Sequence, residues 1–303
     1  LLPRFRRPPL AVQLLICIFE EATVPICSFV LKNGKATVNG LYFKLSDFKG
    51  GMEVQKQKVL EALADKSCGY FYETEQQNYV QIPGSPISYW VSDKVFEIFK
   101  SDSLGNHYDI KAGICTGANA KFIFYWHEIN FRQTNICSPA DYRYTAHNKG
   151  GEYRKWYGNR ELILKYNSQA LQQMECNDGF RHDGKEYYFL EHIGWSKITS
   201  GKSSFRLFED GFTFDSAGLG LFPNSQQNIY VTLAFLNSCV SEELIALLNP
   251  TLNVTPMVVK KLPFCADNRC TNVGKIGIEN VGIEKKDWDS YETSWDFKRN
   301  PLV

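Results

Sequence analysis

The chain has 303 residues, of which 44% are hydrophobic and 14% aromatic, and its formal net charge at pH 7 is +1. This composition is typical of one large or two smaller folded domains and excludes a disordered chain. The near-neutral charge excludes a uniformly basic surface, so a face that binds nucleic acid must be a local patch offset by acids elsewhere.

Residues 1–50 predict the closing edge of an α/β domain. Residues 22–31 are apolar and β-branched enough for a buried strand, and Asn33-Gly34 supplies a hairpin turn. Residues 36–45 alternate between apolar and polar side chains as the returning strand of that hairpin.

Between residues 51 and 109 the sequence predicts helices that link two domains. Residues 52–64 have the pattern of a polar helix, and a second helix begins at Ser85-Pro86, where a capping residue precedes a first-turn proline. The stripe of this second helix that is expected to face the core consists of Ile87, Trp90, Val91, Val95, Ile98 and Phe99.

From residue 110 onward, short β-prone pieces alternate with turns rich in Gly, Asn and Ser, which predicts an irregular β-rich domain with long functional loops. The expected strands are residues 121–126, 187–190, 205–208 and 212–214. Residues 233–248 predict a helix that Asn249-Pro250 terminates. No apolar run reaches the roughly 20 residues of a membrane span, and we expect a cytoplasmic protein.

The nine cysteines predict free thiols rather than a disulfide framework. Their number is odd and several lie in apolar runs, such as that around Cys27, so we expect buried thiols in a reducing compartment. Cys265 and Cys270 resemble half of a zinc site, but no second pair of ligands completes it, so no metal is expected. Because residues 1–17 contain no initiator Met and no clear cleavage site, we interpret the chain as a fragment rather than as a secreted protein.

Residues 214–220 superficially resemble the Gly-rich loop that holds S-adenosylmethionine in methyltransferases. That loop requires a strand before it and a helix after it, whereas Phe222-Pro223-Asn224-Ser225 begins a turn here. The Asn/Asp-Pro-Pro-Tyr/Phe motif that grips a flipped base is also absent. We therefore expect Gly218 and Gly220 to form a tight strand-to-turn corner, and we expect no cofactor-binding or catalytic residues. The five histidines show no metal or triad spacing.

Residues 148–159 combine glycines, cations and aromatic rings. Between residues 141 and 165 six Lys or Arg accompany three acids. Cations pair with phosphates or guanine edges, and aromatic rings stack on bases, so both nucleic-acid contact and an ordinary loop remain open interpretations. The candidate DNA-binding residues are Lys149, Arg154, Lys155 and Trp156.

Residues 194–206 carry three cations and no acid. Their hydroxyls and glycine amides suit phosphate oxygens, while the alternative is a polar hairpin. The candidate DNA-binding residues are Trp195, Lys197, Lys202 and Arg206.

Several ordered motifs, taken together, resemble one family. They are Ile82 to Trp90, Lys111 to Glu128, Lys149 to Asn159, Gly194 to Lys197, Phe235 to Ser238, Leu248 to Asn253 and Asp287 to Phe297. From about Phe19 to its end the chain resembles the adenine-specific DNA methyltransferases of the bacteriophage exclusion (BREX) type, the PglX family. In that family an N-terminal Rossmann-like domain binds S-adenosylmethionine and methylates adenine, and a C-terminal region reads the DNA.

The resemblance implies an α+β fragment with three parts. These are the last strands of a Rossmann-like methyltransferase domain at residues 1–50, linker helices at 51–109, and a mixed, β-rich target-recognition domain with packing helices at 110–303. It implies double-stranded DNA, the missing methyltransferase domain of the same chain and other defence-system proteins as partners. The alternative is a protein-interaction module that docks other defence-system components without reading DNA.

The resemblance also favours one DNA-facing surface made by the two basic segments. Lys155, Lys197 and Lys202 are expected to contact phosphates, and Arg154 to read a guanine. Lys149 and Arg206 complete the basic lining, and the two tryptophans support the surface or touch the duplex.

We predict that the fragment alone neither binds S-adenosylmethionine nor methylates DNA, because the cofactor loop and the base-gripping motif lie outside its 303 residues. Isothermal titration calorimetry with S-adenosylmethionine is expected to give no saturable heat. A saturable micromolar signal would overturn the interpretation of residues 214–220 as a structural corner.

Overall fold

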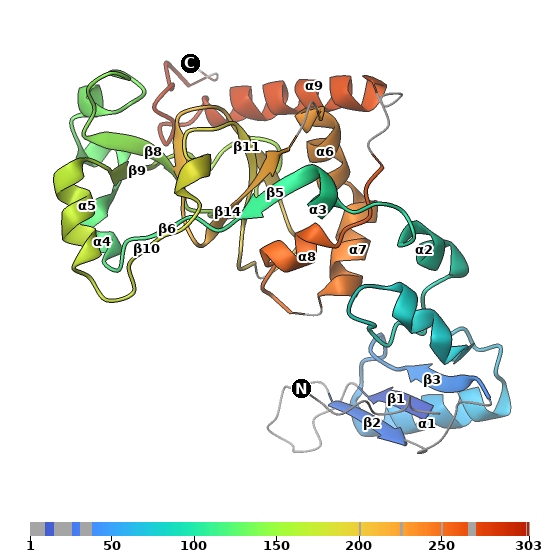
Figure 1. Ribbon diagram of the computed structural model, residues 1–303. Helices are drawn as coiled ribbons and strands as arrows, with labels where there is room; N and C mark the ends of the chain where they lie inside the picture. Colours follow the sequence, from blue (N-terminus) through green and yellow to red (C-terminus); the bar gives the residue numbers. More distant parts are fainter. Residues whose placement is uncertain are drawn as a thin grey trace. The chain divides into compact units, whose positions relative to one another are not determined.

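The computed structural model describes residues 10–14, 26–30, 38–199, 201–224, 227–249, 251–265, 271–300 and 302 (Figure 1). Contacts divide the chain into two compact units, Leu1–Lys100 and Ser101–Val303. Helices accompany several sheets whose strands pair mostly antiparallel, as in an α+β protein.

The first unit contains a four-stranded sheet in the order β2-β1-β3-β4. Its strands are β1 (Leu10–Leu14), β2 (Ile26–Val30), β3 (Gly40–Lys44) and β4 (Phe71–Thr74). β1 pairs antiparallel with β2 and parallel with β3, so it lies between the two strands that the sequence predicted as a hairpin. The predicted hairpin is wrong, because strand β1, which the sequence did not predict, lies between its two arms. The Asn33-Gly34 turn lies outside the described residues.

Helix α1 (Gly51–Ala64) confirms the predicted polar helix. Ala62 is buried in one cluster with Phe43 and Leu45 of the sheet region, and Val59 packs against them. Helix α1 therefore belongs to the core of the first unit, and the division from the second unit falls after Lys100.

The helix predicted from Ser85 onward begins later than expected. Ser85 has a φ of +49°, in the left-handed region that a right-handed helix excludes. Helix α2 (Asp93–Ile98) is short, and its buried residue is Phe96. Ile87 and Trp90 are exposed, so the predicted core-facing stripe is wrong, because these residues do not share a helix with α2. A 3₁₀ helix, η1 (Gln76–Gln81), precedes this region.

Two four-stranded sheets form the frame of the second unit, and the first of them has the order β12-β11-β14-β5. Its strands are β5 (Tyr108–Lys111), β11 (His192–Ser196), β12 (Phe205–Phe208) and β14 (Gly218–Pro223). All of its pairs are antiparallel. β11 and β12 form a hairpin, so the polar-hairpin interpretation describes the backbone of residues 194–206 correctly.

The second sheet has the order β13-β8-β9-β7. Its strands are β7 (Ile123–Tyr125), β8 (Tyr144–Asn148), β9 (Leu162–Lys165) and β13 (Phe212–Phe214). β13 runs parallel to β8, whereas β9 pairs antiparallel with both β8 and β7. Two short strands, β6 (Ile114–Cys115) and β10 (Arg181–His182), pair separately.

The strands predicted at 205–208 and 212–214 are confirmed. The strand predicted at 187–190 is wrong, because this region continues a 3₁₀ turn, η4 (Lys185–Tyr187), and Phe189 has a φ of +69°. The strand predicted at 121–126 is partly right, since one helical turn, α4 (Asn119–Phe122), precedes β7.

The helix predicted over residues 233–248 is two helices, α6 (Ile229–Leu236) and α7 (Cys239–Leu248). Between them the Asn237 side chain accepts from the Phe205 N–H over 3.0 Å and donates to the Phe205 carbonyl over 2.9 Å. The Ser238 hydroxyl then caps α7 by accepting from the Ser241 N–H. The break therefore ties the helices to strand β12.

The remaining helices of the second unit are α3 (Leu104–His107), α5 (Ser168–Glu175), α8 (Pro256–Lys260) and α9 (Thr271–Trp288), with 3₁₀ turns η2 (Trp126–Glu128) and η3 (Phe131–Gln133). The long helix α9 packs along α6 (Figure 1). A Cβ on Gly277 would lie 2.5 Å from the Tyr230 carbonyl oxygen, so this close approach requires glycine.

Within the described part of the chain no single helix is long and apolar enough to cross a membrane; α6 and α7 pass that test only as a pair bent by 67°.

Six cysteines are free thiols in the structure: Cys68, Cys115, Cys137, Cys176, Cys239 and Cys265. Their predicted burial is wrong for four of them and for Cys27, which are exposed. The apolar neighbours that suggested core positions can themselves face solvent, as Phe29 does beside Cys27. Cys17 and Cys270 lie outside the described residues, so the proposed half zinc site has no described geometry.

Phe214 is predicted to be a main support of the second unit's core. It is fully buried, with the rings of Tyr188 and Phe222 at 5.3 and 5.2 Å between centroids. Phe214→Ala should cost about 3–5 kcal/mol in the free energy of unfolding measured with urea, because it leaves a cavity. The exposed Ile198→Ala serves as control and should change it by about 0.5 kcal/mol or less. Similar values for both variants would contradict this assignment.

Candidate nucleic-acid interface

The two basic segments, residues 148–159 and 194–206, lie side by side in the structure. The Ser196 hydroxyl donates to the Gly151 carbonyl over 2.8 Å. The Trp156 N–H donates to the Phe205 carbonyl over 2.8 Å. The Trp156 carbonyl accepts from the N–H of Leu207, two residues further along the same strand, over 2.9 Å. Segments that are distant in sequence thus form one surface of the second unit.

The backbone of the first segment adopts conformations that L-residues seldom take. Gly150 and Gly151 have φ values of +86° and +114°, and Trp156 and Asn159 have values of +70° and +53°. A Cβ on Gly150 would lie 3.0 Å from the Ser196 hydroxyl oxygen, so glycine permits the close approach of the two segments. The strain at Trp156, of order 1–3 kcal/mol, is sustained by its hydrogen bonds to strand β12.

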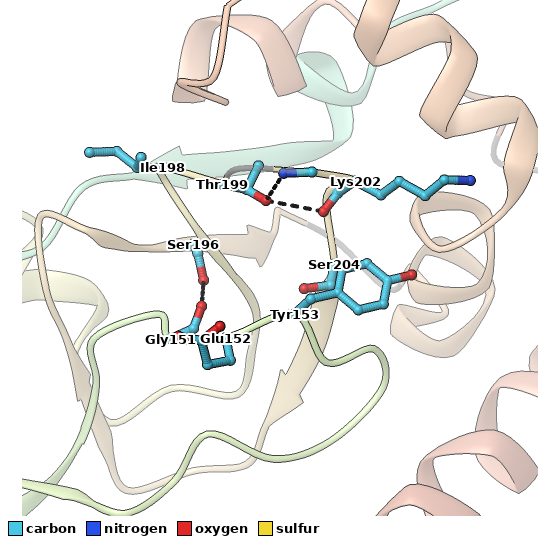
Figure 2. A pocket seen from close by; sticks show the side chains of 9 residues that line it. Gly151, Glu152, Tyr153, Ser196, Ile198, Thr199, Lys202 and Ser204 are labelled. Atoms are coloured by element: carbon cyan, nitrogen blue, oxygen red, sulfur yellow. Dashed lines mark hydrogen bonds between the residues drawn. The ribbon is translucent and has the colours of Figure 1, made fainter.

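A hollow of about 420 Å³ opens between the two segments (Figure 2). Its lining consists of Gly151, Glu152, Tyr153, Ser196, Ile198, Thr199, Gly201, Lys202 and Ser204. Tyr153 and Ile198 are 56% and 66% exposed. The Thr199 hydroxyl accepts from the Gly201 N–H and donates to the Lys202 carbonyl, each over 3.2 Å, which shapes the turn above the hollow. The hollow has the volume of a small-ligand site and combines hydroxyls, one carboxylate and two exposed apolar side chains.

Lys149 points into the protein rather than toward a partner. Its Nζ donates to Asp215 Oδ2 over 2.9 Å. Burial alone would raise the pKa of Asp215, but His147 and the Lys149 ammonium together lower it to about 2. His147 Nε2 lies 3.6 Å from the same oxygen, too far for a hydrogen bond, so we attribute the stabilisation mainly to Lys149. Burial lowers the pKa of His147, which keeps its imidazole neutral.

Arg154 and Lys155 are also held by groups of the second unit. The Arg154 guanidinium forms ion pairs with Asp287 and Glu284 of α9, and its carbon lies 5.2 Å from the centre of the Trp288 ring. Lys155 Nζ donates to the Asn237 carbonyl at the end of α6 over 2.7 Å. Arg154 thus braces its loop against α9.

Trp195 and Arg206 are fully buried, so neither can touch a duplex in this structure. Trp195 Nε1 donates to the Val254 carbonyl over 2.9 Å. Arg206 donates to the Arg154 carbonyl and to the hydroxyls of Ser204 and Ser196 over 3.0, 3.1 and 3.2 Å. Burial lowers the pKa of Arg206 to about 10, and the residue stays charged at neutral pH. Both residues support the surface from beneath, because strands β11 and β12 carry their side chains inward.

Lys197 and Lys202 remain at the surface. Lys202 Nζ forms an ion pair with Glu242 over 2.7 Å, and Figure 2 shows its side chain directed away from Ser196 and Gly151. Lys197 is half-buried and forms no ion pair with a described carboxylate. Of the six cations predicted to form the basic surface, Lys197 has the charge least engaged by described residues. Trp156 is half-buried and bonds to strand β12.

Residues 214–220 do not fit S-adenosylmethionine. Strand β13 leads through a corner directly into β14, so no helix N-terminus follows the glycines. The Asp215 carboxylate is already occupied by Lys149 and by the Ala217 N–H, from which it accepts over 2.8 Å. Among the described residues no group of three or more His, Cys, Asp or Glu could hold a metal ion.

Comparison with known proteins relates these segments to one group of enzymes. No family model matches the chain. It is 36% identical to "Adenine-specific methyltransferase PglX" of Lacticaseibacillus casei (strain Zhang), over 94% of this chain and 25% of that protein. It is 31% identical to "Adenine-specific methyltransferase BrxX" of Escherichia coli O9:H4 (strain HS), over 92% of this chain and 22% of that protein. This chain is a homologue of one part of these methyltransferases. It spans about a quarter of the length of the curated relatives it matches.

In this relative of PglX and BrxX, Lys202 is a candidate DNA-binding residue that lines the hollow, whereas the other eight lining residues, among them Glu152, Tyr153 and Ile198, were not candidates. Tyr153 lies within residues 148–159, where Trp156 is the aromatic residue among the DNA-binding candidates. Ile198 is an apolar residue within a polar hairpin, and such isolated exposed apolar residues are an available, though weak, signal for a contact surface.

The Lys149–Asp215 pair is predicted to stabilise the fold of this PglX relative. Lys149→Met leaves a buried carboxylate without its cation and should cost about 3 kcal/mol, near the lower limit for a broken buried pair because the Lys149 side chain is 26% exposed. Asp215 has a folded-state pKa of about 2, below the unfolded value of about 3.9, so its contribution is full above the unfolded pKa and is lost as pH falls toward 2.

Urea unfolding at neutral pH and at about pH 3 measures the cost of Lys149→Met and the loss of the Asp215 contribution at low pH. In Lys149→Met the folded-state pKa of Asp215 rises, so the variant should already lack this contribution at neutral pH. The exposed Lys121→Met is the matched control. If both variants unfold alike at neutral pH, Lys149 is not the partner that stabilises Asp215.

Proposed function

We propose that this chain is the DNA target-recognition part of a larger, BREX-type adenine-specific DNA methyltransferase that acts in cytoplasmic defence against bacteriophages. Its sequence similarity to PglX and BrxX supports the reaction class. The first unit would belong to the closing edge of the methyltransferase domain, and the second unit would read double-stranded DNA. S-adenosylmethionine would bind elsewhere in the full-length protein.

The observation that carries this proposal is the hollow between the two segments. Its chemistry suits base edges better than phosphates, because its lysine is paired with Glu242 and its lining adds the carboxylate of Glu152. A carboxylate accepts from the amino group of cytosine, hydroxyls pair with any base edge, and an apolar side chain such as Ile198 contacts a thymine methyl. Lys197 next to the hollow would then contact a phosphate, which fixes the register of the duplex.

The rigidity of the hollow also suits recognition. Specific readout requires side chains that are already placed before the DNA arrives, since ordering them on binding would cost affinity. The left-handed residues of the loop, its bonds to β12 and the buried Arg206 beneath it restrict the backbone that carries Glu152 and Tyr153.

One observation favours the alternative of a protein-interaction module. Helix α9 exposes Val273, Ile276 and Ile283 on one flank, a spacing at which the face of one helix can pack against another. A docked defence-system partner would cover this flank, and that role does not require the hollow.

Methylome sequencing of cells that carry the full-length parent tests the base-reading role. Glu152→Gln and Tyr153→Ala should relax the methylated sequence at one position, with discrimination lowered by about 1–3 kcal/mol, while adenine methylation persists. The exposed Lys185→Ala, outside the hollow, is the control and should leave the motif unchanged. An unaltered motif in both hollow variants would contradict base reading by the hollow and favour the interaction module.

A further inference from the structure

A second hollow, of about 470 Å³, lies at the C-terminal end of α9 and is separate from the one just described. It is lined by Lys285, Lys286, Asp289, Asp296, Lys298 and Arg299. Four cations therefore share it with two carboxylates. It is formed by the end of α9 and the residues that follow it up to Arg299, and none of its lining residues lines the first hollow.

The four cations of this basic hollow differ from most of those of the base-reading surface in forming no ion pair with a described carboxylate. Each is exposed, and none forms an ion pair with a described carboxylate. By contrast, Lys149, Arg154 and Lys202 are each paired with acids, and Arg206 is buried. An anion that enters the basic hollow need not break an existing ion pair with these carboxylates.

The positions of these cations are set by an anchored backbone. After α9, the Thr293 carbonyl accepts from Trp126 Nε1 over 3.0 Å, and the Trp295 ring packs on the rings of Phe131 and Phe212. The buried Ser294 donates to Asp289 Oδ1 over 2.7 Å, which occupies part of one of the two carboxylates of the hollow. Lys298 and Arg299 follow directly on this anchor, and Lys285 and Lys286 belong to the last turn of the helix.

The basic hollow is also connected to the loop of the base-reading surface. Arg154 of that loop pairs with Glu284 and Asp287, and its single charge offsets one of the two negative charges that weaken the positive potential at Lys285 and Lys286. Lys285 Nζ lies 5.2 Å from the centre of the Tyr157 ring in the same loop. The cations of the basic hollow are therefore held by the same helix, α9, that holds the loop, and a duplex bound at the loop would lie close to them.

We propose that the basic hollow is a phosphate-binding site that takes backbone phosphates of the DNA next to the recognised bases. This rests on the proposed function and extends it by separating phosphate contact from base reading. Free phosphate or a nucleotide would present the same chemistry. The described lining residues include no aromatic ring on which a nucleotide base would stack, which favours the continuous backbone of a duplex.

Binding of the 303-residue chain to a duplex, measured by fluorescence anisotropy at several salt concentrations, tests the proposal. The double variant Lys286→Gln, Arg299→Gln removes one cation from the last turn of α9 and one from the segment that follows it. It should lower the slope of log affinity against log salt concentration by about two units, and by the same amount on cognate and scrambled duplexes. The control, Lys121→Gln with Lys185→Gln, makes the same change of net charge at exposed lysines outside the hollow. Thermal melting checks that both variants fold.

The outcomes separate this inference from the proposed function. If the unmodified chain binds DNA and both double variants lose the same small part of the slope, the basic hollow makes no phosphate contact, while DNA recognition stands. If the chain binds no duplex at all, both proposals fail. Tripolyphosphate titrated into isotope-labelled protein, followed by NMR, shows whether the hollow binds free phosphates. Chemical-shift changes of the Arg299 side chain, without any effect of the Lys286→Gln, Arg299→Gln variant on DNA binding, would assign the hollow to free phosphates and overturn its role on DNA.

Discussion

The buried guanidinium of Arg206 is the interaction on which the shape of the candidate interface depends. It has no solvent exposure, and it donates to one carbonyl and two hydroxyls that belong to both basic segments. The Ser196 hydroxyl, which accepts from Arg206, also donates to the Gly151 carbonyl and so links the second basic segment to the first. A buried charge without such partners is very costly, so the segments can keep Arg206 inside only while they stay together.

This use of a cation as an internal link recurs throughout the second unit. Lys149 neutralises a buried aspartate, Arg154 crosses to the acids of α9, and Lys155 caps the end of α6. Residues that a linear sequence presents as one basic surface are distributed among four internal connections. The surface that results is less positive than its composition suggests, and the hollow in it is lined by hydroxyls, one carboxylate and an exposed ring.

The sequence was informative where local chemistry decides the outcome. The hairpin of β11 and β12, the strand Phe212–Phe214 and the helix Gly51–Ala64 follow from alternation and composition. It was also possible to select the two segments that enclose the hollow. What could not be predicted depended on distant partners: the strand β1 between two expected neighbours, and the inward direction of Arg206 and Trp195. Burial of a cation depends on carbonyls and hydroxyls from elsewhere in the chain, which periodicity does not reveal.

A formal charge of +1 is therefore a poor guide to what this chain binds. The electrostatic potential at a surface depends on which charges are left over after internal pairing, since a cation and a carboxylate in contact largely cancel at a distance beyond a Debye length of about 8 Å. In the second unit the pairing of Arg154 with α9 engages one cation at the base-reading loop and two acids beside the basic hollow. This pairing thus lowers the positive charge left at the loop and offsets part of the negative charge beside the basic hollow. In the proposed role, this arrangement would place non-specific attraction to the DNA backbone beside the base-reading site rather than within it, so that a protein can hold a backbone and still discriminate bases.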